Sequence, residues 1–207
     1  MKKLGHRGVI LKSASPYQNS IAAMQLALKH GDGFETDLCL SADQEVFFIH
    51  DSKYLGGEVK YCIEEHLDSK SQEIVKGRRI DQLSSEEVRG LRLRDGSSIP
   101  DFDEVLGLFK NNRKILNLEL KSHQAERVVA KRIAAAVKNG ALLAEQLIIS
   151  SFNHSALEFI RSELPEVRVG MLFLPAEFAP APIYPWSEES VEYQPISGNY
   201  LESEITK

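Results

Sequence analysis

Apolar residues recur along this chain at two spacings, one typical of strands and one typical of helices. Single-residue alternation places successive side chains on opposite faces of a strand, whereas spacings of three or four mark one face of a helix. The alternation is clearest over 33–40, where Phe34 and Leu38 share one face, and 115–121 repeats it. The other apolar patterns predict strands over 46–49, 147–150 and 168–173 and helices over 19–30, 101–110, 124–138 and 153–163. Asn19 is expected to cap the first of these helices and Gly31 to end it.

Strands that alternate with helices of about ten to fifteen residues predict parallel βαβ units and therefore an α/β fold. Two stretches depart from this alternation. Residues 52–100 hold many charges and a capping box from Ser84 to Glu87, so we expect a surface excursion with one short helix there. Residues 174–187 are rich in proline and predict a loop, and 193–196 predict a short sixth strand.

The composition is that of an ordinary globular domain, and we expect one domain over 1–207. Hydrophobic residues make up 43% and charged residues 27% of the chain, which excludes disordered and collagen-like proteins. The net charge of −5 disfavours nucleic acid as a partner. We expect no transmembrane segment, because no apolar run approaches about 18 residues. The start, MKKLGHRGVI, lacks the apolar core of a leader, and two cysteines suit a reducing cytoplasm.

Glu35 and Asp37 lie two residues apart in the first alternating strand, so both carboxylates point to the same face. A solvent-exposed strand face is the usual explanation of such a pair. Parallel sheets are normally covered on both faces, however, and a covered pair of acids needs a cation or an opening nearby. A hard divalent cation bound by carboxylate oxygens meets that need.

A second polar face runs along 116–121, where Asn117, Glu119 and Lys121 alternate with leucines. Water covering one side of an amphipathic strand would explain this pattern too. In a parallel barrel the polar face would instead point into the interior near the mouth, and Glu119 would join the other two acids on one metal. Lys121 would then be placed to bind an anion.

The six histidines fall into two groups. His6 and His50 each follow an apolar strand, where α/β folds place their sites, and histidine is suited to proton transfer near neutral pH. His30 ends a predicted helix, where it interacts with the helix dipole. The remaining histidines are expected to be exposed to solvent: His66, His123 and His154. Cys39 lacks the spacing of a zinc site and is expected to pack as a small residue.

A series of motifs resembles the glycerophosphodiester phosphodiesterase family. In order, the chain carries His6-Arg7-Gly8, Asn19-Ser20, Glu35-Thr36-Asp37, Asp43, His50-Asp51, Ile99-Pro100, Leu118-Glu119-Leu120-Lys121 and Ser151-Phe152. The resemblance implies a TIM-barrel enzyme that uses one divalent cation, Mg²⁺ or Ca²⁺. Its implied substrates are small-molecule glycerophosphodiesters, which it would cleave to glycerol 3-phosphate and an alcohol.

The resemblance also implies a role for each matching residue. The implied metal ligands are Glu35, Asp37 and Glu119. The implied general acid–base pair is His6 and His50, and which of them is the acid stays open. The implied phosphate-binding cations are Arg7 and Lys121. Residues 52–100 resemble the small inserted subdomain that caps the barrel mouth in this family.

Three features depart from the family pattern. Gln18 stands where the family usually has glutamate, and the residues after His50-Asp51 lack its frequent Arg-Thr-Thr run. The family's later W-T-V-N and G-x-D-x-I-x-T-D strands are not found, and eight βα units typically take about 250 residues, so we expect a barrel without its last strands. A C-terminally incomplete, non-catalytic remnant and a related lipid phosphodiesterase therefore stay open as alternatives, as does the oligomeric state.

Overall fold

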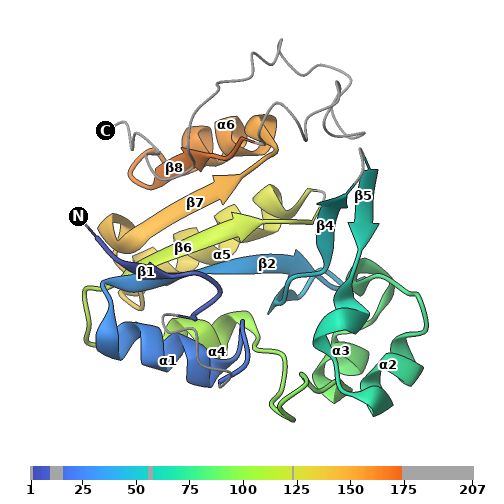
Figure 1. Ribbon diagram of the computed structural model, residues 1–207. Helices are drawn as coiled ribbons and strands as arrows, with labels where there is room; N and C mark the ends of the chain where they lie inside the picture. Colours follow the sequence, from blue (N-terminus) through green and yellow to red (C-terminus); the bar gives the residue numbers. More distant parts are fainter. Residues whose placement is uncertain (1, 10–15, 56–57, 123, 174–207) are drawn as a thin grey trace.

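A single mixed sheet organises the fold, and its strands run mostly parallel (Figure 1). The computed structural model describes residues 2–9, 16–55, 58–122 and 124–173. Five parallel strands follow one another across the sheet in the order β1 (Leu4–Gly5), β2 (Gly33–Leu40), β6 (Ile115–Leu120), β7 (Leu147–Ser151) and β8 (Arg168–Met171). A further strand, β3 (Val46–Phe48), pairs antiparallel with the end of β2. It departs from the predicted parallel order because a short turn joins it directly to β2.

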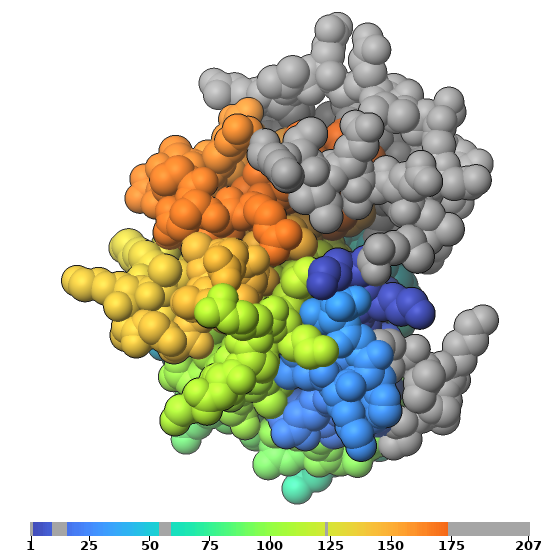
Figure 2. Space-filling model, turned by 90° about the vertical axis from the view of Figure 1, so that its left-hand side faces the viewer, coloured from blue at the N-terminus to red at the C-terminus, as the bar shows by residue number. Residues whose placement is uncertain are grey.

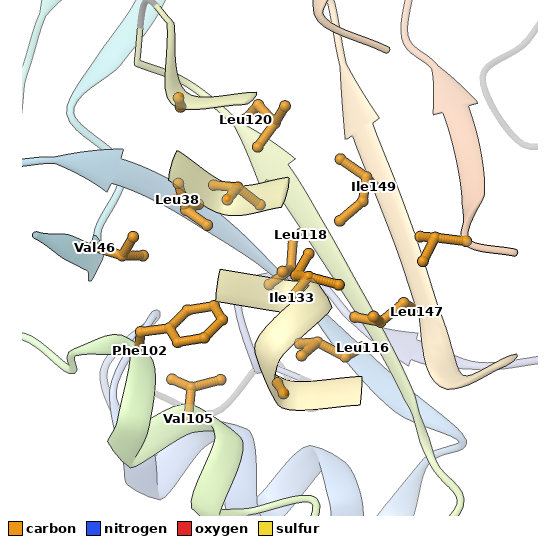
Figure 3. Packing of buried hydrophobic residues seen from close by; sticks show 14 of the residues in the cluster. Leu38, Val46, Phe102, Val105, Leu116, Leu118, Leu120, Ile133, Leu147 and Ile149 are labelled. Carbon is orange, nitrogen blue, oxygen red and sulfur yellow. The ribbon is translucent and has the colours of Figure 1, made fainter. Parts of the chain in front are cut away.

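Helices cover one face of this sheet. They are α1 (Ile21–His30), α4 (Phe102–Gly107), α5 (Ala125–Lys138) and α6 (His154–Glu163). Their apolar sides join alternate strand residues in one buried cluster, as Figure 3 shows for Val105, Ile133 and Leu118. The polar residues that alternate with these leucines face the other side. Helices outside and a polar strand face inside are the arrangement of a TIM-barrel wall.

The excursion over 52–100 is more ordered than the single short helix that its sequence predicts. It contains β4 (Ser52–Leu55), β5 (Glu58–Tyr61), α2 (Ser69–Val75), α3 (Ser85–Gly90) and the 3₁₀ turns η1 (Ile63–His66) and η2 (Ile80–Gln82). The predicted capping box at the start of α3 is confirmed, with Ser84 Oγ accepting from Glu87 N at 3.2 Å. Leu67, Ile80 and Leu91 form part of a second apolar cluster. This cap, residues 52–100, lies at the carboxyl end of β2 (Figure 1).

The start of α1 differs from prediction by one residue. Ser20 caps the helix, because its Oγ accepts from Ala23 N at 3.2 Å. Asn19, the predicted cap, has a left-handed backbone with φ 57° and uses its side chain elsewhere. Gly31 ends the helix as predicted, with its N–H donating to Ala27 O at 2.8 Å. The change matters because it frees the Asn19 amide for the polar face of the sheet.

The end of the sheet where the parallel strands begin is tied together by hydrogen bonds between connecting segments. Figure 2 shows this end, with the green residues before β6 lying between blue α1 and the yellow residues before β7. Lys114 Nζ donates to Gly31 O at 2.8 Å. Gln146, in the 3₁₀ turn η3 (Ala144–Gln146), donates from Nε2 to Asn112 O at 2.9 Å. These bonds fix the strand starts, and the functional candidates gather toward the other end.

Several predictions fall outside the described residues: the loop over 174–187, the strand at 193–196 and the exposure of His123. The predicted absence of the last barrel strands concerns the same C-terminal region. Within the described ranges, none of the helices combines the length and apolar character needed to span a bilayer.

Candidate active site

Three acidic side chains meet on the polar face of the sheet. In the parallel pairing of β2 with β6, Asp37 lies opposite Glu119 and Glu35 lies opposite Asn117. One carboxylate oxygen from each of the three acids lies within 4.8 Å of the others. The shared register therefore brings together the acids that the sequence predicts as a cluster.

These carboxylates have fewer hydrogen-bond donors among the described residues than their oxygens can accept. Glu35 Oε1 has none there, and Asp37 Oδ1 and Glu119 Oε1 have no partner there besides the Lys121 ammonium. Asp37 is fully buried and Glu119 is 8% exposed, so bulk water does not compensate for the missing donors. Three convergent oxygens of this kind fit the hard-cation chemistry of Mg²⁺ or Ca²⁺.

Arg7 reaches the acids from the turn after β1. Its backbone N–H donates to Glu35 Oε2 at 2.9 Å, and its guanidinium Nε lies 3.0 Å from Asp37 Oδ2. The turn needs left-handed backbone, with φ 54° at Arg7 and 76° at Gly8. A Cβ on Gly8 would lie 2.8 Å from Met24 N, so only glycine lets this turn pack against α1.

Lys121 reaches the same acids from the end of β6. Its Nζ lies 2.5 Å from Glu119 Oε1 and 3.4 Å from Asp37 Oδ1. The structure thus places both predicted phosphate-binding cations against the acid cluster. Each of them lies where an anion bound beside the acids would meet a positive charge.

The two predicted proton-transfer histidines approach the acids from different sides. His6 Nε2 lies 3.8 Å from Glu35 Oε2, and the His6 side chain is 73% exposed. His50 is buried, and the preceding Ile49 N–H donates to the Asp37 carbonyl at 3.1 Å. One histidine therefore lies at the solvent edge of the cluster and the other lies beneath the cap.

Comparison with known proteins identifies the family. The model of the glycerophosphoryl diester phosphodiesterase family matches residues 6–205. The chain belongs to this family. A glycerophosphodiester phosphodiesterase from Caldanaerobacter subterraneus is 27% identical to it over 177 residues, which are 82% of this chain and 65% of that relative. The chain therefore spans less than two thirds of the relative's length.

Solved structures share the fold of this phosphodiesterase-family chain. A glycerophosphodiester phosphodiesterase from Parabacteroides distasonis is 24% identical, with a TM-score of 0.62 over 86% of this chain and 68% of that one. A phosphodiesterase from Oleispira antarctica, solved in complex with the product sn-glycerol-3-phosphate, is 22% identical, with a TM-score of 0.59 over 86% and 67%. These likenesses confirm the predicted TIM-barrel class.

Burial and the neighbouring charges together set the charge state of Glu35 and Asp37 in this family member. It raises the pKa of Glu35 to about 8, and the negative charges of Asp37 and Glu119 add to the rise. Burial acts in the same direction on Asp37, but Lys121 and Arg7 outweigh it and hold that pKa below its usual range. A divalent cation would favour the ionised form of all three acids.

Burial also keeps His50 of the phosphodiesterase-family chain neutral, because it lowers the His50 pKa to about 3. The ring contacts Cys62 Sγ through Nδ1 at 3.6 Å and lies edge-on to His66, with centroids 5.6 Å apart. The predicted exposure of His66 is wrong, since only 8% of it is exposed. Ile63 and Leu67, both buried, draw η1 into the cap's apolar cluster and bring His66 with them.

The sequence reasoning also missed polar residues that support the site. Asn19 Nδ2 donates to Asp37 Oδ2 at 3.0 Å, and Thr36 Oγ1 donates to Asn19 Oδ1 at 2.8 Å. Gln18 Oε1 accepts from Arg7 Nη1 at 2.9 Å. The polar pair Gln18-Asn19 directly before the first helix could have indicated these contacts, but helix capping explained the same pair equally well.

Three further side chains can be compared with their predicted environments, and two of them lie as predicted. Cys39 is fully buried and donates from Sγ to Ile49 O at 3.2 Å, which fits the packed residue expected. His30 lies exposed in the last turn of α1. His154 is only partly exposed, contrary to prediction, because its Nε2 lies 3.1 Å from Leu172 O.

Proposed function

We propose that this chain hydrolyses glycerophosphodiesters to glycerol 3-phosphate and an alcohol, using one divalent cation, Mg²⁺ or Ca²⁺. The observation that carries the proposal is the largely buried group of Glu35, Asp37 and Glu119, in which three carboxylate oxygens have no partner in the described part of the chain besides the Lys121 ammonium. Two cations adjoin this group. That combination suits a metal and a phosphate bound side by side.

Family membership supports the same reaction. The relative from Caldanaerobacter subterraneus bears the name of this activity, and the Oleispira antarctica structure holds its phosphate-containing product. This chain spans 65% of the length of the first of these relatives, so we propose the activity for this chain and do not take it over from the relative's name. The cytoplasmic location stays a prediction from composition.

Arg7 and Lys121 would hold the phosphate. The Arg7 guanidinium offers a planar set of N–H donors, and the Lys121 ammonium offers a compact positive charge. Both now pair with Asp37, so a bound cation that shares the acid's charge would leave their donors available to the substrate. When bound, the cation supplies Lewis-acid polarisation of the phosphoryl oxygens.

His6 and His50 would move the protons. One ring would accept a proton from the attacking water as the new P–O bond forms, and the other would donate a proton to the leaving alkoxide as the old P–O bond breaks. Which histidine takes which part stays open.

The proposal is tested by following glycerol 3-phosphate released from glycerophosphocholine in the presence of Mg²⁺ or Ca²⁺. Glu119→Gln removes one ligand charge while keeping the shape of the side chain, and we expect at least about a hundredfold loss of activity. Glu158→Gln, on the exposed side of α6, is the matched control and should retain activity. Equal rates for both variants and the wild type would refute the proposed site.

A further inference from the structure

A second group of metal-ligating side chains lies beneath the cap, apart from the three acids. His50 follows β3, Cys62 follows β5, and His66 ends η1. All three are buried, with exposed fractions of 8%, 4% and 8%. One ligand atom of each lies within 4.8 Å of the other two.

The distances in this group are close to those around a tetrahedral metal ion. Cys62 Sγ lies 3.6 Å from His50 Nδ1 and 4.0 Å from His66 Nε2. Zinc bonds of about 2.3 Å to sulfur and about 2.0 Å to nitrogen, at the tetrahedral angle, separate the two ligand atoms by about 3.5 Å. The Cys62–His50 distance matches this separation, and the Cys62–His66 distance exceeds it by about half an ångström.

We propose that His50, Cys62 and His66 form a binding site for a thiophilic divalent cation of the Zn²⁺ class. One thiolate and two imidazoles select borderline-soft ions, whereas the carboxylate group selects hard ions such as Mg²⁺. Three protein ligands leave the fourth tetrahedral position to water or another small ligand. The chain then carries two neighbouring cation sites of different chemistry.

The surroundings of His66 supply the partner that a metal-bound imidazole needs. For Nε2 to bind a metal, Nδ1 must carry the proton and donate it. Tyr17 Oη lies 3.1 Å from His66 Nδ1 and itself donates to Glu65 O at 3.4 Å, which leaves its lone pairs free to accept. Gln18 Nε2 also lies 3.1 Å from Nδ1 and, because it can only donate, pairs with this nitrogen only when the ring proton is on Nε2. Metal binding at Nε2 would therefore replace the Gln18 contact with the one to Tyr17.

Metal binding would also remove the proton of the Cys62 thiol. Burial raises the pKa of this thiol to about 11, so the S–H bond is intact when no metal is bound. On binding, that bond breaks, the proton passes to solvent, and the sulfur electron pair forms the bond to the metal.

Occupation of this site has a consequence that depends on the proposed function. A metal bound to His50 would immobilise a ring that the proposed hydrolysis uses for proton transfer. Zn²⁺ would therefore inhibit the Mg²⁺-dependent reaction, and Cys62→Ser would be inhibited less.

The direct test is a Co²⁺ titration of the full chain under reducing conditions, with Mg²⁺ in excess to fill the carboxylate site. We expect one Co²⁺ per chain and a thiolate-to-cobalt charge-transfer band in the near ultraviolet. Cys62→Ser should lose the band, while Cys39→Ser should keep it, because Cys39 is the other of the chain's 2 cysteines and lies outside the cluster. His66→Gln should weaken Co²⁺ binding by about tenfold or more.

Two results would overturn the site: no charge-transfer band with folded wild-type protein, or a band that survives in Cys62→Ser and disappears in Cys39→Ser. Circular dichroism and thermal melting of each variant separate loss of binding from loss of folding. The band is read without substrate, so a failure of the proposed hydrolysis would leave it unchanged.

Discussion

Asp37 connects most of the groups in the candidate site. Its two oxygens contact the Arg7 guanidinium, the Lys121 ammonium and the Asn19 amide, and one of them also faces the proposed cation. A buried carboxylate of this kind is stable only with such partners. Residues that orient Asp37 should therefore affect cation binding even though they are not ligands.

Asn19→Ala tests this dependence. The substitution removes the 3.0 Å bond to Asp37 and the 2.8 Å bond from Thr36, so we expect Mg²⁺ affinity, measured by calorimetry, to fall about tenfold to a hundredfold. Asn111→Ala is the matched control, because Asn111 has the same left-handed backbone, with φ 68°, but is exposed. Equal Mg²⁺ affinities for the two variants would mean that Asn19 acts through the backbone alone.

Asp43 is a motif residue with a structural task. Its carboxylate accepts from Ser85 N at 2.8 Å, from Ser85 Oγ at 2.6 Å and from Ser41 Oγ at 2.7 Å. These bonds join the β2–β3 turn to the start of α3 and so tie the barrel wall to the cap. The hydrogen bonds from Ser85 and Ser41 lower the pKa of Asp43 to about 2.

This lowered pKa predicts a pH-dependent stability. The folded pKa lies below the unfolded value of about 3.9, so the stabilisation is present at neutral pH and is lost as pH falls through about 4 to 2. Asp43→Asn should therefore unfold at lower urea than wild type at pH 7, with the difference narrowing toward pH 2. A difference in stability that stays constant from pH 7 to pH 2 would contradict a stabilising role of the ionised Asp43 carboxylate. Asp103→Asn, exposed on α4, is the control for the loss of one surface carboxylate.

At the scale of elements, the pairing of β2 with β6 decides whether the three acids meet. A shift of one residue would turn Glu119 toward the helices and move Leu120 to the polar face. The pairing starts at Gly33, opposite Ile115. The backbone there has φ 152°, and a Cβ on Gly33 would lie 1.9 Å from Ile115 O.

Gly33→Ala should therefore disrupt the start of this pairing. We expect a loss of about 3 kcal/mol or more in the free energy of unfolding, measured by urea denaturation, because the added methyl clashes with backbone that cannot move alone. Gly90→Ala is the control, since a Cβ there meets no atom of the described residues within 4 Å. A small and equal effect of both substitutions would show that the register does not depend on Gly33.

Local sequence patterns predicted the elements of the barrel wall well, because each strand and helix there has one clear apolar side. Residues 33–40 form β2 with the bounds predicted, and the helix over 153–163 forms α6 from His154. The cap was harder to predict, since its elements are short and its core is assembled from residues such as Ile63 and Leu91 that are far apart in sequence. The burial of His66 follows from that assembly, so no local pattern could reveal it.

At the scale of the whole molecule, the described residues combine a barrel wall and a cap around a polar centre. The motifs predicted all seven candidate site residues, and the structure gathers them at this centre. The surroundings of His50, formed by Cys62 and His66, depend on how the cap packs on the sheet. That packing is a long-range property, which explains why the sequence predicted which residues lie together better than it predicted what surrounds them.

Cation binding should stabilise the whole molecule. Mg²⁺ at about a hundred times its dissociation constant would add about 2.7 kcal/mol to the stability of the folded state. We expect the melting temperature of chelator-treated protein to rise by several degrees when Mg²⁺ is restored, and Glu119→Gln to show little of this rise. An equal rise in both proteins would place the stabilising cation elsewhere.

The most direct test of metal-dependent hydrolysis at the three acids is a chelation experiment on the wild-type chain. Glycerol 3-phosphate release from glycerophosphocholine is measured before chelation, after removal of divalent cations, and after Mg²⁺ or Ca²⁺ is returned. We predict that release stops on chelation and recovers when the cation is restored. Release that continues at the same rate without divalent cations, from protein that remains folded, would contradict this account.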